Sequence, residues 1–394
     1  MELVCKIQNY EWGKIGSQSK VALLFKNANE DFTIDESKPY AELWMGTHVN
    51  GPSCERNTGQ PLSEIIAKHP EYLGEKVAKD FNKELPFLFK VLSVNKALSI
   101  QAHPSKKHAE ELHAKFPDVY KDPNHKPEMA VALTPFEALC GFRPTCEIHR
   151  FIEDIPALKK LLSDCLSLQN HEEFLKNSFR KVLTTDKVTM KTTIEELISW
   201  LRKLDDNDQK KYLAELVQRL DSQFPNDNGI IMVYFLNYLK LEPSQALYLE
   251  ANDPHAYLSG DCMEIMACSD NVVRAGLTPK FVDVDTLCSM LIYKGQQPKD
   301  KLFQPIKENE HISLFKPPVK DFALVEIRLP SSTREYKVAP RDSASIILVV
   351  EGRVKTNISD LKAGSVLFLP ANNVLHIREV SEDVLLYQGL ANVF

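Results

Sequence analysis

The sequence lacks several features that mark large classes of proteins. No glycine-rich phosphate loop of the P-loop or Rossmann kind occurs, which argues against the use of a nucleotide. No G-x-S-x-G elbow is present, so serine hydrolase chemistry has no support. A basic excess is also missing, because the formal net charge is −6. General nucleic-acid binders usually carry such an excess, and we expect no nucleic-acid partner.

Cysteine pairs and long apolar runs are absent as well. None of the eight cysteines forms a C-x-x-C pair, so we expect reduced thiols and neither a thiolate zinc site nor a disulfide framework. The first ten residues do not follow the charged-then-apolar plan of a signal peptide. The most apolar run, Ile230 to Leu241, is too short and interrupted to cross a bilayer. These absences predict a soluble, cytoplasmic protein without a membrane partner.

The residue patterns change twice along the 394 residues, a length that allows two or three domains. Phe87 to Ile100 is typical of two strands joined at Asn95 and Lys96, because bulky apolar and β-branched residues dominate it. From about Phe151 to Leu241, apolar residues recur at helical spacing and predict a helical block. From Gln245 onward, short apolar runs favour an antiparallel sandwich or barrel. The predicted order is therefore β, then α, then β.

Local signals add detail to this order. Ser105 suits the N-cap of a short helix that extends to Phe116. Glycine marks two tight turns, Glu351-Gly352 and Ala363-Gly364. The strands predicted in the last region are Ala246–Leu249, Phe322–Leu329, Ile346–Val350 and Val366–Leu369.

Two parts of the sequence hold unusually many ionisable groups beside apolar ones. The first comprises Gln101–Pro104 (Q-A-H-P) and Tyr120–Glu128 (Y-K-D-P-N-H-K-P-E). The second runs from His255 to Lys280. We interpret the two as parts of one site that holds a divalent metal and an anionic substrate.

Four side chains in these segments are candidate metal ligands, namely Gln101, His103, Glu128 and His255. If Leu98 to His103 is a strand, Gln101 and His103 point to the same face. A neutral imidazole is a good ligand for zinc, and a carboxylate complements it. Glutamine is not among the usual zinc ligands, and the spacing matches no regular metal signature. On the residues alone, His103 and His255 could equally be inert histidines at strand ends.

Charged residues in the same segments suit an anionic substrate. Lys126, Arg274 and Lys280 lie in polar pieces of chain, and both guanidinium and ammonium groups bind phosphate. Most lysines and arginines simply face water, so that interpretation stays open for all three. Glu264 lies between apolar residues in M-E-I-M, where burial would raise its pKa toward the range useful for proton transfer. Asp270 could be no more than a turn residue.

These segments resemble the type I phosphomannose isomerase family, the zinc-dependent mannose-6-phosphate isomerases. Tyr120–Glu128 is similar to the first signature of the family, and His255–Lys280 fits the second throughout, including H-A-Y, S-D-N and R-A-G-L-T-P-K. Supporting segments are Gln8–Gly13 (Q-N-Y-E-W-G), Glu42–His48 (E-L-W-M-G-T-H) and Ser99–Pro104 (S-I-Q-A-H-P). The landmarks cover most of the chain in the family's order, although the helical middle carries none.

The resemblance implies a mainly β fold of cupin-like jelly rolls with an inserted α-helical domain. The implied divisions are residues 1–150 as the N-terminal part of the catalytic domain, 151–243 as the helical domain, 244–300 as the remainder of the catalytic domain, and 301–394 as a C-terminal jelly roll.

The resemblance also implies roles for single residues. The ligands of one zinc ion per chain would be Gln101, His103, Glu128 and His255. Arg274 matches the active-site arginine of the family. Glu264 and Lys126 are the two candidates for the base that moves a proton, and we favour Glu264. The remaining residues expected to line the substrate pocket are Ser99, Tyr257, Asp270 and Lys280.

The implied reaction interconverts mannose 6-phosphate and fructose 6-phosphate through an enediol. It would supply mannose 6-phosphate for GDP-mannose synthesis and glycosylation. The expected partner is this small-molecule sugar phosphate, and the expected state is a monomer. Two alternatives share the fold. One is a non-catalytic cupin that binds a sugar or a metal, and the other is a metal-dependent hydrolase or dioxygenase, whose sites usually hold ferrous iron with two histidines and a carboxylate.

Overall fold

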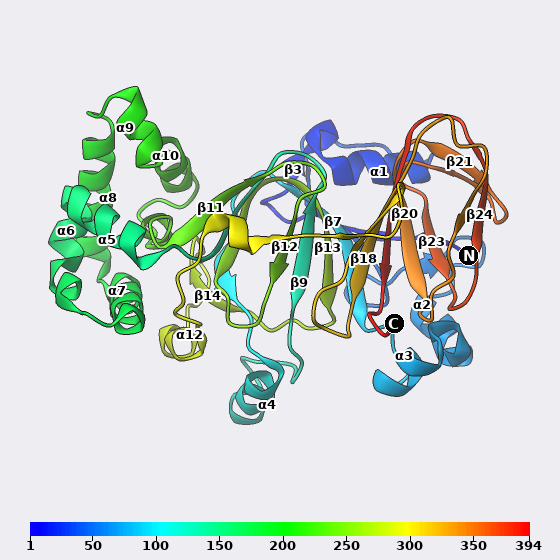
Figure 1. Cartoon of the computed structure of the whole chain (residues 1–394), viewed down its shortest axis with the longest axis horizontal. Coiled ribbons are helices and arrows are strands. Elements are labelled where there is room, and N and C mark those ends of the chain that lie inside the picture. The colour runs from blue at the N-terminus through cyan, green and yellow to red at the C-terminus, as the bar shows by residue number, and fades with distance from the viewer.

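The computed structural model describes residues 1–394 as three regions in a row. Helices form one end, a β region lies in the middle, and a second β region forms the other end (Figure 1). The chain passes from β to α and back to β, so the predicted mainly β fold with an inserted helical domain is confirmed. No helix is both long and apolar enough to cross a membrane.

The first part of the chain alternates short strands with a few helices. Its strands are β1 (Glu2–Val4), β2 (Lys6–Gln8), β3 (Lys14–Ile15), β4 (Pro39–Tyr40), β5 (Glu42–Met45), β6 (Cys54–Glu55), β7 (Phe87–Val94), β8 (Ile100–Ala102), β9 (Glu128–Ala132) and β10 (Phe136–Phe142). Its helices are α1 (Lys20–Ala28), α2 (Leu62–Lys68), α3 (Glu75–Asp80) and α4 (Lys106–Lys115). The Ser105 side chain accepts a hydrogen bond from the His108 N–H, which confirms the predicted N-cap of α4.

The inserted helices pack around one apolar core through the stripes visible in the sequence. They are α5 (Thr145–Asp154), α6 (Pro156–Leu162), α7 (His171–Thr184), α8 (Lys187–Leu201), α9 (Asp206–Lys211), α10 (Ala214–Gln223) and α11 (Gly229–Met232). Asn170 and Asp186 cap α7 and α8 by accepting hydrogen bonds from first-turn N–H groups. The helical prediction is wrong for Leu236–Leu241, which forms strand β11 and pairs with β10. An apolar run of this length suits a buried helix or strand equally, and the open edge of β10 decides it.

The chain then returns to the middle region before it enters the second β region. The middle strands are β12 (Ala246–Leu249), β13 (His255–Ala267), β14 (Val273–Gly276) and β15 (Leu302–Phe303), with helix α12 (Val284–Met290) between the last two. The later strands are β16 (Ile306–Lys307), β17 (Ile312–Phe315), β18 (Ala323–Leu329), β19 (Tyr336–Val338), β20 (Ser345–Glu351), β21 (Arg353–Thr356), β22 (Asp360–Lys362), β23 (Val366–Leu369), β24 (Leu375–Val380) and β25 (Val384–Leu390). All four strands predicted here are therefore confirmed.

Strand β13 organises the middle region. Along its 13 residues it pairs antiparallel with β10 and β8 near its start and with β7 and β9 near its end. Gly260 lies where the strand changes partners, at a φ of 108°, and a Cβ there would lie 2.5 Å from the Pro135 carbonyl oxygen. Only glycine fits this bend without displacing the backbone. One half of β13 therefore pairs with β8 and β10, and the other half pairs with β7 and β9.

The two β regions are joined by a shared core and a shared sheet. Phe89 and Ile265 of the middle region belong to the same apolar cluster as Phe315 and Tyr387 of the second. The eight-stranded sheet of the second region also includes β1 and β6 from the start of the chain, at its edge beside β23. The domain limits 1–150, 151–243, 244–300 and 301–394 stay a prediction.

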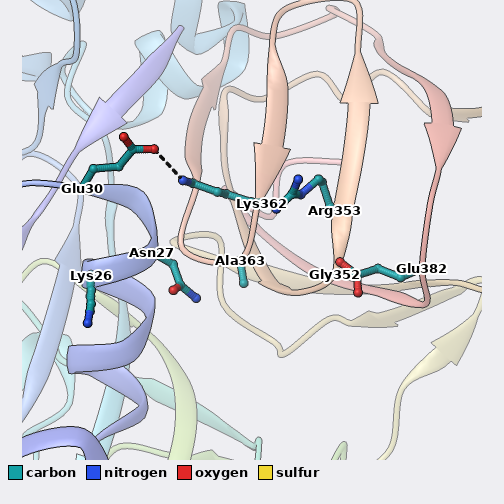
Figure 2. A pocket seen from close by; sticks show the side chains of 8 residues that line it. All are labelled: Lys26, Asn27, Glu30, Gly352, Arg353, Lys362, Ala363 and Glu382. Carbon is teal, nitrogen blue, oxygen red and sulfur yellow. Dashed lines mark hydrogen bonds and ion pairs between the residues drawn. The ribbon is translucent and has the colours of Figure 1, made fainter.

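A surface pocket of about 470 Å³ lies where α1 faces the second β region (Figure 2). Its lining residues are Lys26, Asn27, Glu30, Gly352, Arg353, Lys362, Ala363 and Glu382. The Lys362 ammonium lies 3.2 Å from the Glu30 carboxylate across it. No residue of this pocket belongs to the segments predicted to form the site.

Candidate metal centre and active site

Three neighbouring strands place residues of the predicted site opposite one another, although these residues lie far apart in the sequence. His255, the first residue of β13, lies opposite Gln101 in β8, and Gln101 lies opposite Arg274 in β14. Directly opposed residues of antiparallel strands project from the same face of the sheet. Gln101, His255 and Arg274 therefore share one face, although more than 150 residues separate the first from the other two in the chain.

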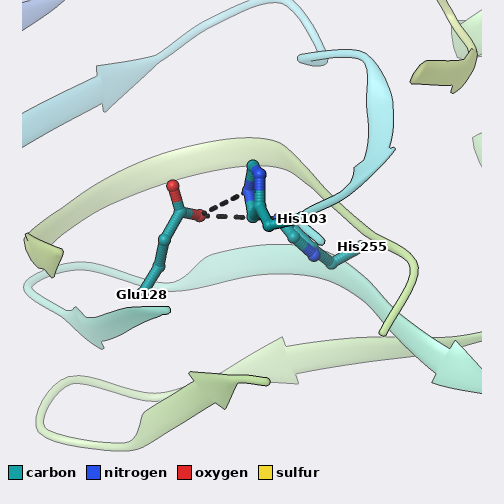
Figure 3. A group of neighbouring side chains, drawn as sticks. All are labelled: His103, Glu128 and His255. Atoms are coloured by element: carbon teal, nitrogen blue, oxygen red, sulfur yellow. Dashed lines mark ion pairs between the residues drawn. The ribbon is translucent and has the colours of Figure 1, made fainter. Parts of the chain in front are cut away.

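His103, Glu128 and His255 form a compact buried group (Figure 3). One ligand atom from each lies within 4.8 Å of the others. The Nε2 atoms of both histidines lie 3.5 Å from the same oxygen, Oε2 of Glu128. His103 is completely buried, and His255 and Glu128 are 1% and 2% exposed. The strand register places Gln101 beside His255.

Backbone carbonyls fix which histidine nitrogen faces the group. The Nδ1 of His103 lies 2.7 Å from the Asn271 carbonyl oxygen, and the Nδ1 of His255 lies 2.9 Å from that of Asp253. A carbonyl only accepts, so each Nδ1 carries its proton and donates it. Each Nε2 of the neutral imidazoles then presents a lone pair toward Glu128. Metal-binding histidines are commonly oriented by such a second hydrogen bond.

The charge states within the group also suit a cation. Burial lowers the pKa of His103 to about 4, so its imidazole is neutral at neutral pH. Burial alone would raise the pKa of Glu128, but the Lys126 charge outweighs it and holds that pKa well below its ordinary value. Two neutral imidazoles and one carboxylate are the protonation states that bind divalent metals.

Two buried nitrogen atoms without hydrogen-bond partners indicate that the group can bind a cation. Neither the His103 Nε2 nor the His255 Nε2 has a hydrogen-bond partner, although both are buried. Buried polar atoms are nearly always paired, and an unpaired one calls for an explanation such as an ion. A divalent cation among the three side chains would satisfy both lone pairs and the carboxylate oxygen together. The donor set therefore fits a metal such as zinc.

Lys126 faces the other oxygen of the same carboxylate. Its Nζ lies 3.2 Å from Oε1 of Glu128, on a side chain that is 12% exposed. One oxygen of Glu128 thus faces the imidazoles and the other faces an ammonium.

Glu264 belongs to a buried charge cluster on the adjacent strands β7 and β13. It lies opposite Lys90 in the strand register, and the Lys90 Nζ lies 3.0 Å from Glu264 and 3.4 Å from Glu42. The Trp44 indole donates a hydrogen bond to Glu42. Burial opposes the charge of Lys90, but the carboxylates of Glu264 and Glu42 outweigh it and raise its pKa. One lysine therefore balances two buried acids.

The pKa of Glu264 is raised in this cluster. Burial is the main cause, and the nearby Glu128 charge adds to it, while Lys90 acts in the opposite direction. Lys90 and Glu42 were not among the predicted site residues. The signal was present, because Lys90 stands in F-L-F-K-V-L, as isolated among apolar residues as Glu264 is in M-E-I-M. A lone charge within a fully buried strand needs a partner.

Tyr257 and Arg274 lie near the group without strong partners. The Tyr257 hydroxyl is buried and unpaired, and burial with the carboxylates of Glu264 and Glu128 raises its pKa well above the ordinary value. Arg274 forms no ion pair with any carboxylate, and partial burial lowers its pKa. A half-buried guanidinium without an acidic partner is available to an anionic ligand.

The remaining predicted residues lie farther out or lack contacts with the group. Asp270 is exposed on a loop, and its carboxylate lies 3.6 Å from the His48 imidazole, whose proximity lowers the pKa of Asp270. Lys280 is exposed, and its ammonium pairs with no other group. Ser99 precedes β8 and forms no side-chain hydrogen bond with the group. The contacts within the chain therefore do not link Ser99 or Lys280 to the buried group of His103, Glu128 and His255.

Comparison with known proteins identifies the family. Models of type I phosphomannose isomerase match the chain over residues 1–145 for the catalytic domain, 156–236 for the helical insertion domain and 313–361 for the C-terminal part. The mannose-6-phosphate isomerase of Mus musculus is 44% identical over 98% of this chain and 97% of its own length. The chain belongs to the type I phosphomannose isomerase family. The resemblance carried by the two signature segments is thereby confirmed.

Solved phosphomannose isomerase structures share the whole fold. The apo form of mannose 6-phosphate isomerase from Salmonella typhimurium matches with a TM-score of 0.85 at 31% identity, over 100% of this chain and 99% of that one. A zinc-bound mannose 6-phosphate isomerase matches with the same TM-score, identity and coverage. All three regions of this phosphomannose isomerase family member are therefore accounted for by the fold of its relatives.

Proposed function

We propose that this chain is a zinc-dependent isomerase that interconverts mannose 6-phosphate and fructose 6-phosphate. The observation that carries the proposal is the buried trio of His103, Glu128 and His255, with two unpaired imidazole nitrogens aimed at one carboxylate. The trio occurs in a chain that matches mannose-6-phosphate isomerases along nearly its full length. Its mannose 6-phosphate would serve GDP-mannose synthesis and glycosylation.

The proposed ligands of one zinc ion are Gln101, His103, Glu128 and His255. The strand register that sets Gln101 beside His255 supports the glutamine as the fourth ligand, and the second hydrogen bonds of both histidines support their orientation. A bound zinc ion would supply Lewis acidity that polarises the oxygens on C1 and C2 of the open-chain sugar.

The reaction moves one proton between neighbouring carbons. From mannose 6-phosphate, the base removes the C2 proton, and the electrons of that C–H bond form the enediol. The same proton, carried by the base, then returns to C1, while the hydroxyl proton passes from O2 to O1. No atom is gained or lost. The product has its carbonyl at C2, as in fructose 6-phosphate.

We propose Glu264 as the base, with Lys126 as the alternative. A carboxylate whose pKa is raised accepts a carbon-bound proton more readily than one of ordinary pKa, because a base is most effective near the working pH. The raised pKa of Glu264 supports this choice. The Lys90 ammonium, 3.0 Å away, keeps the carboxylate oriented between turnovers.

The anionic parts of the substrate need cations. We propose that Arg274 binds the phosphate or the oxygen that becomes negative in the transition state, which its lack of an acidic partner supports. Ser99, Tyr257, Asp270 and Lys280 are proposed to line the rest of the pocket. The exposed ammonium of Lys280 suits the outer, phosphate-bearing end of the sugar.

A coupled assay on mannose 6-phosphate tests the proposed function. Zinc-loaded protein should turn over mannose 6-phosphate, with formation of fructose 6-phosphate followed by an enzyme that oxidises a downstream product. Arg274→Ala serves as the matched variant, since it keeps the metal ligands but should lose most of the activity. No turnover by the zinc-loaded wild-type chain would favour the non-catalytic sugar- or metal-binding cupin.

The trio alone is also the ligand set of ferrous oxygenases, two histidines and one carboxylate. The glutamine beside His255 distinguishes the two candidates, since that set leaves further positions open for oxygen and a cosubstrate. Elemental analysis of the purified protein should find zinc at one ion per chain. Stoichiometric iron in its place would support the oxygenase alternative.

We further propose that the protein acts in the cytoplasm as a monomer on this small-molecule substrate, without nucleic-acid or membrane partners. All eight cysteines are free thiols, which supports a reducing compartment. The net charge of −6 supports the absence of a nucleic-acid partner.

A further inference from the structure

Two neighbouring residues of the loop before β9 contact different regions of the molecule. His125 and Lys126 are neighbours in an extended stretch, where successive side chains point to opposite sides. Lys126 points inward, with its Nζ 3.2 Å from Glu128. His125 points the other way, and its Nε2 lies 3.1 Å from both carboxylate oxygens of Asp321. Asp321 precedes β18 of the second β region (Figure 1).

Asp321 is a firm anchor for this loop. The residue is 7% exposed, and its carboxylate has no hydrogen-bond partner other than His125. The following strand, β18, pairs with β25 along its whole length, and Phe322 is completely buried in the core shared by the two β regions. The position of Asp321 is therefore fixed by the packing of the second region. Because His125 is hydrogen-bonded to Asp321, the packing of the second region also fixes the position of His125.

The same loop is tied to a metal-binding histidine from its inner side. The Asn271 amide donates hydrogen bonds to the carbonyl oxygens of Asp122 and Asn124. The Asn271 carbonyl accepts the hydrogen bond from His103 Nδ1. The loop thus lies between the anchor on Asp321 and the hydrogen bond that orients His103. A shift of the loop would move Lys126 and Glu128 and disturb His103 as well.

We propose that the C-terminal jelly roll positions the active site through the pair of His125 and Asp321. Both act here as positioning residues, since their side chains contact each other and not the buried trio. The inference rests on the proposed isomerase function and assigns a task to the second β region. Removal of either partner leaves the loop free to shift and, for His125, leaves a buried carboxylate unpaired. Displacement of a catalytic group by about 1 Å costs roughly 100-fold in rate.

The test compares Asp321→Ala, His125→Ala and His125→Gln with the wild-type chain in its zinc-loaded form. Asp321→Ala and His125→Ala should lower kcat by about tenfold or more while KM changes little, because the catalytic groups shift but the substrate contacts remain. Both should also lose zinc faster to a chelator. His125→Gln should recover most of the kcat, since its amide can still donate to Asp321.

The chain offers a matched control next to Asp321. The Lys320 ammonium lies 2.9 Å from Asp80 of α3, across the same junction between the β regions. This pair is exposed and does not touch the loop, so Lys320→Gln should leave both kcat and zinc retention unchanged. Circular dichroism and the melting temperature show which variants fold, and if Asp321→Ala does not, the two His125 variants decide alone.

Three outcomes would overturn the inference. These are wild-type kcat and zinc retention in His125→Ala, losses in His125→Gln as large as in His125→Ala, or an equal loss in Lys320→Gln. The failure of the proposed function is a separate result. It would appear as absent turnover in the wild-type chain, and zinc retention by the variants would then still test the coupling between the loop and the metal ligands.

Discussion

Glu128 and Glu264 are both buried carboxylates, yet their surroundings move their pKa values in opposite directions. The Lys126 charge lowers the pKa of Glu128 despite its burial. Burial raises the pKa of Glu264, and the single ammonium of Lys90 is shared with Glu42. Pairs of titratable groups driven apart in this way commonly divide the tasks of an active site. Glu128 suits a permanent metal ligand, and Glu264 suits a carrier of protons.

This division predicts the effect of Glu264→Gln. The variant keeps the shape of the side chain but cannot accept a carbon-bound proton, so kcat should fall by about 10²- to 10⁴-fold. Zinc content should stay at the wild-type value, because Glu264 is not a ligand. Steady-state kinetics and metal analysis on the same preparation check both parts. Near-normal turnover in Glu264→Gln together with its loss in Lys126→Ala would assign the base to Lys126 instead.

Roles could be predicted for single site residues only where they lie in the signature segments of the family. Gln101 would be an unusual ligand, and only the family resemblance and the register beside His255 select it. On spacing alone, His103 and His255 could not be told from inert histidines, because their unpaired nitrogens appear only after folding. Lys90 was missed although its place in an apolar strand pointed to a buried partner. Sequence spacing gives residue types, whereas convergence depends on pairings between strands far apart in the chain.

At the scale of strands and helices, β13 connects the fold to the site. Its first residue is a metal-ligand candidate, and Glu264 lies near its other end, so its bend at Gly260 sets the geometry between them.

Gly260→Ala should lower the free energy of unfolding by at least about 1–3 kcal/mol, because its φ is positive and a Cβ would meet the Pro135 carbonyl. Gly59 has a positive φ but open space around it, so Gly59→Ala is the matched control and should cost less. Equal losses in denaturant titrations would contradict this view of the bend.

Strand β18 carries a buried acid whose pKa predicts a dependence of stability on pH. Burial would raise the pKa of Glu326, but hydrogen bonds from Arg328, Ser244 and Tyr387 outweigh it and lower that pKa. A carboxyl whose pKa is lower in the folded state stabilises the protein above its unfolded pKa of about 4.3. That stabilisation is lost as the pH falls through the folded pKa.

Glu326→Gln should remove this contribution. At pH 7 the variant should be less stable by about 1–3 kcal/mol, because the charged acceptor of three hydrogen bonds is gone. The difference from the wild-type chain should shrink as the pH falls below about 4.3. Melting temperatures of both proteins between pH 3 and 8 measure this difference. A gap that stays constant across the whole range would show that the charge of Glu326 does not contribute.

Several elements could be predicted, and the wrong assignment of Leu236–Leu241 has a physical reason. Strands such as Ala246–Leu249 and Val366–Leu369 stood out because apolar runs of strand length were bounded by turn residues. Leu236–Leu241 was assigned to the helical block, since its apolar residues continue those of the preceding helices. Its strand conformation depends on pairing with β10, a partner that lies about 100 residues earlier and leaves no trace in local periodicity.

The two β regions of the molecule pack together as a single unit. The N-terminal strand β1 completes the sheet of the C-terminal region, and a single apolar core contains residues of both. Neither feature was predicted, because contacts between the first and last parts of a chain have no sequence signature. The arrangement explains how a C-terminal jelly roll without ligands of its own can still hold Asp321 against the active-site loop.

We propose that four side chains from distant parts of the chain share one divalent cation. Anomalous diffraction at the zinc absorption edge, on crystals of the zinc-loaded protein, locates that ion. We expect one strong peak per chain, about 2.0–2.2 Å from the Nε2 atoms of His103 and His255 and from Glu128, with the Gln101 side-chain oxygen as the fourth ligand. A peak bound elsewhere, or none at this group, would show that the four side chains do not hold the ion.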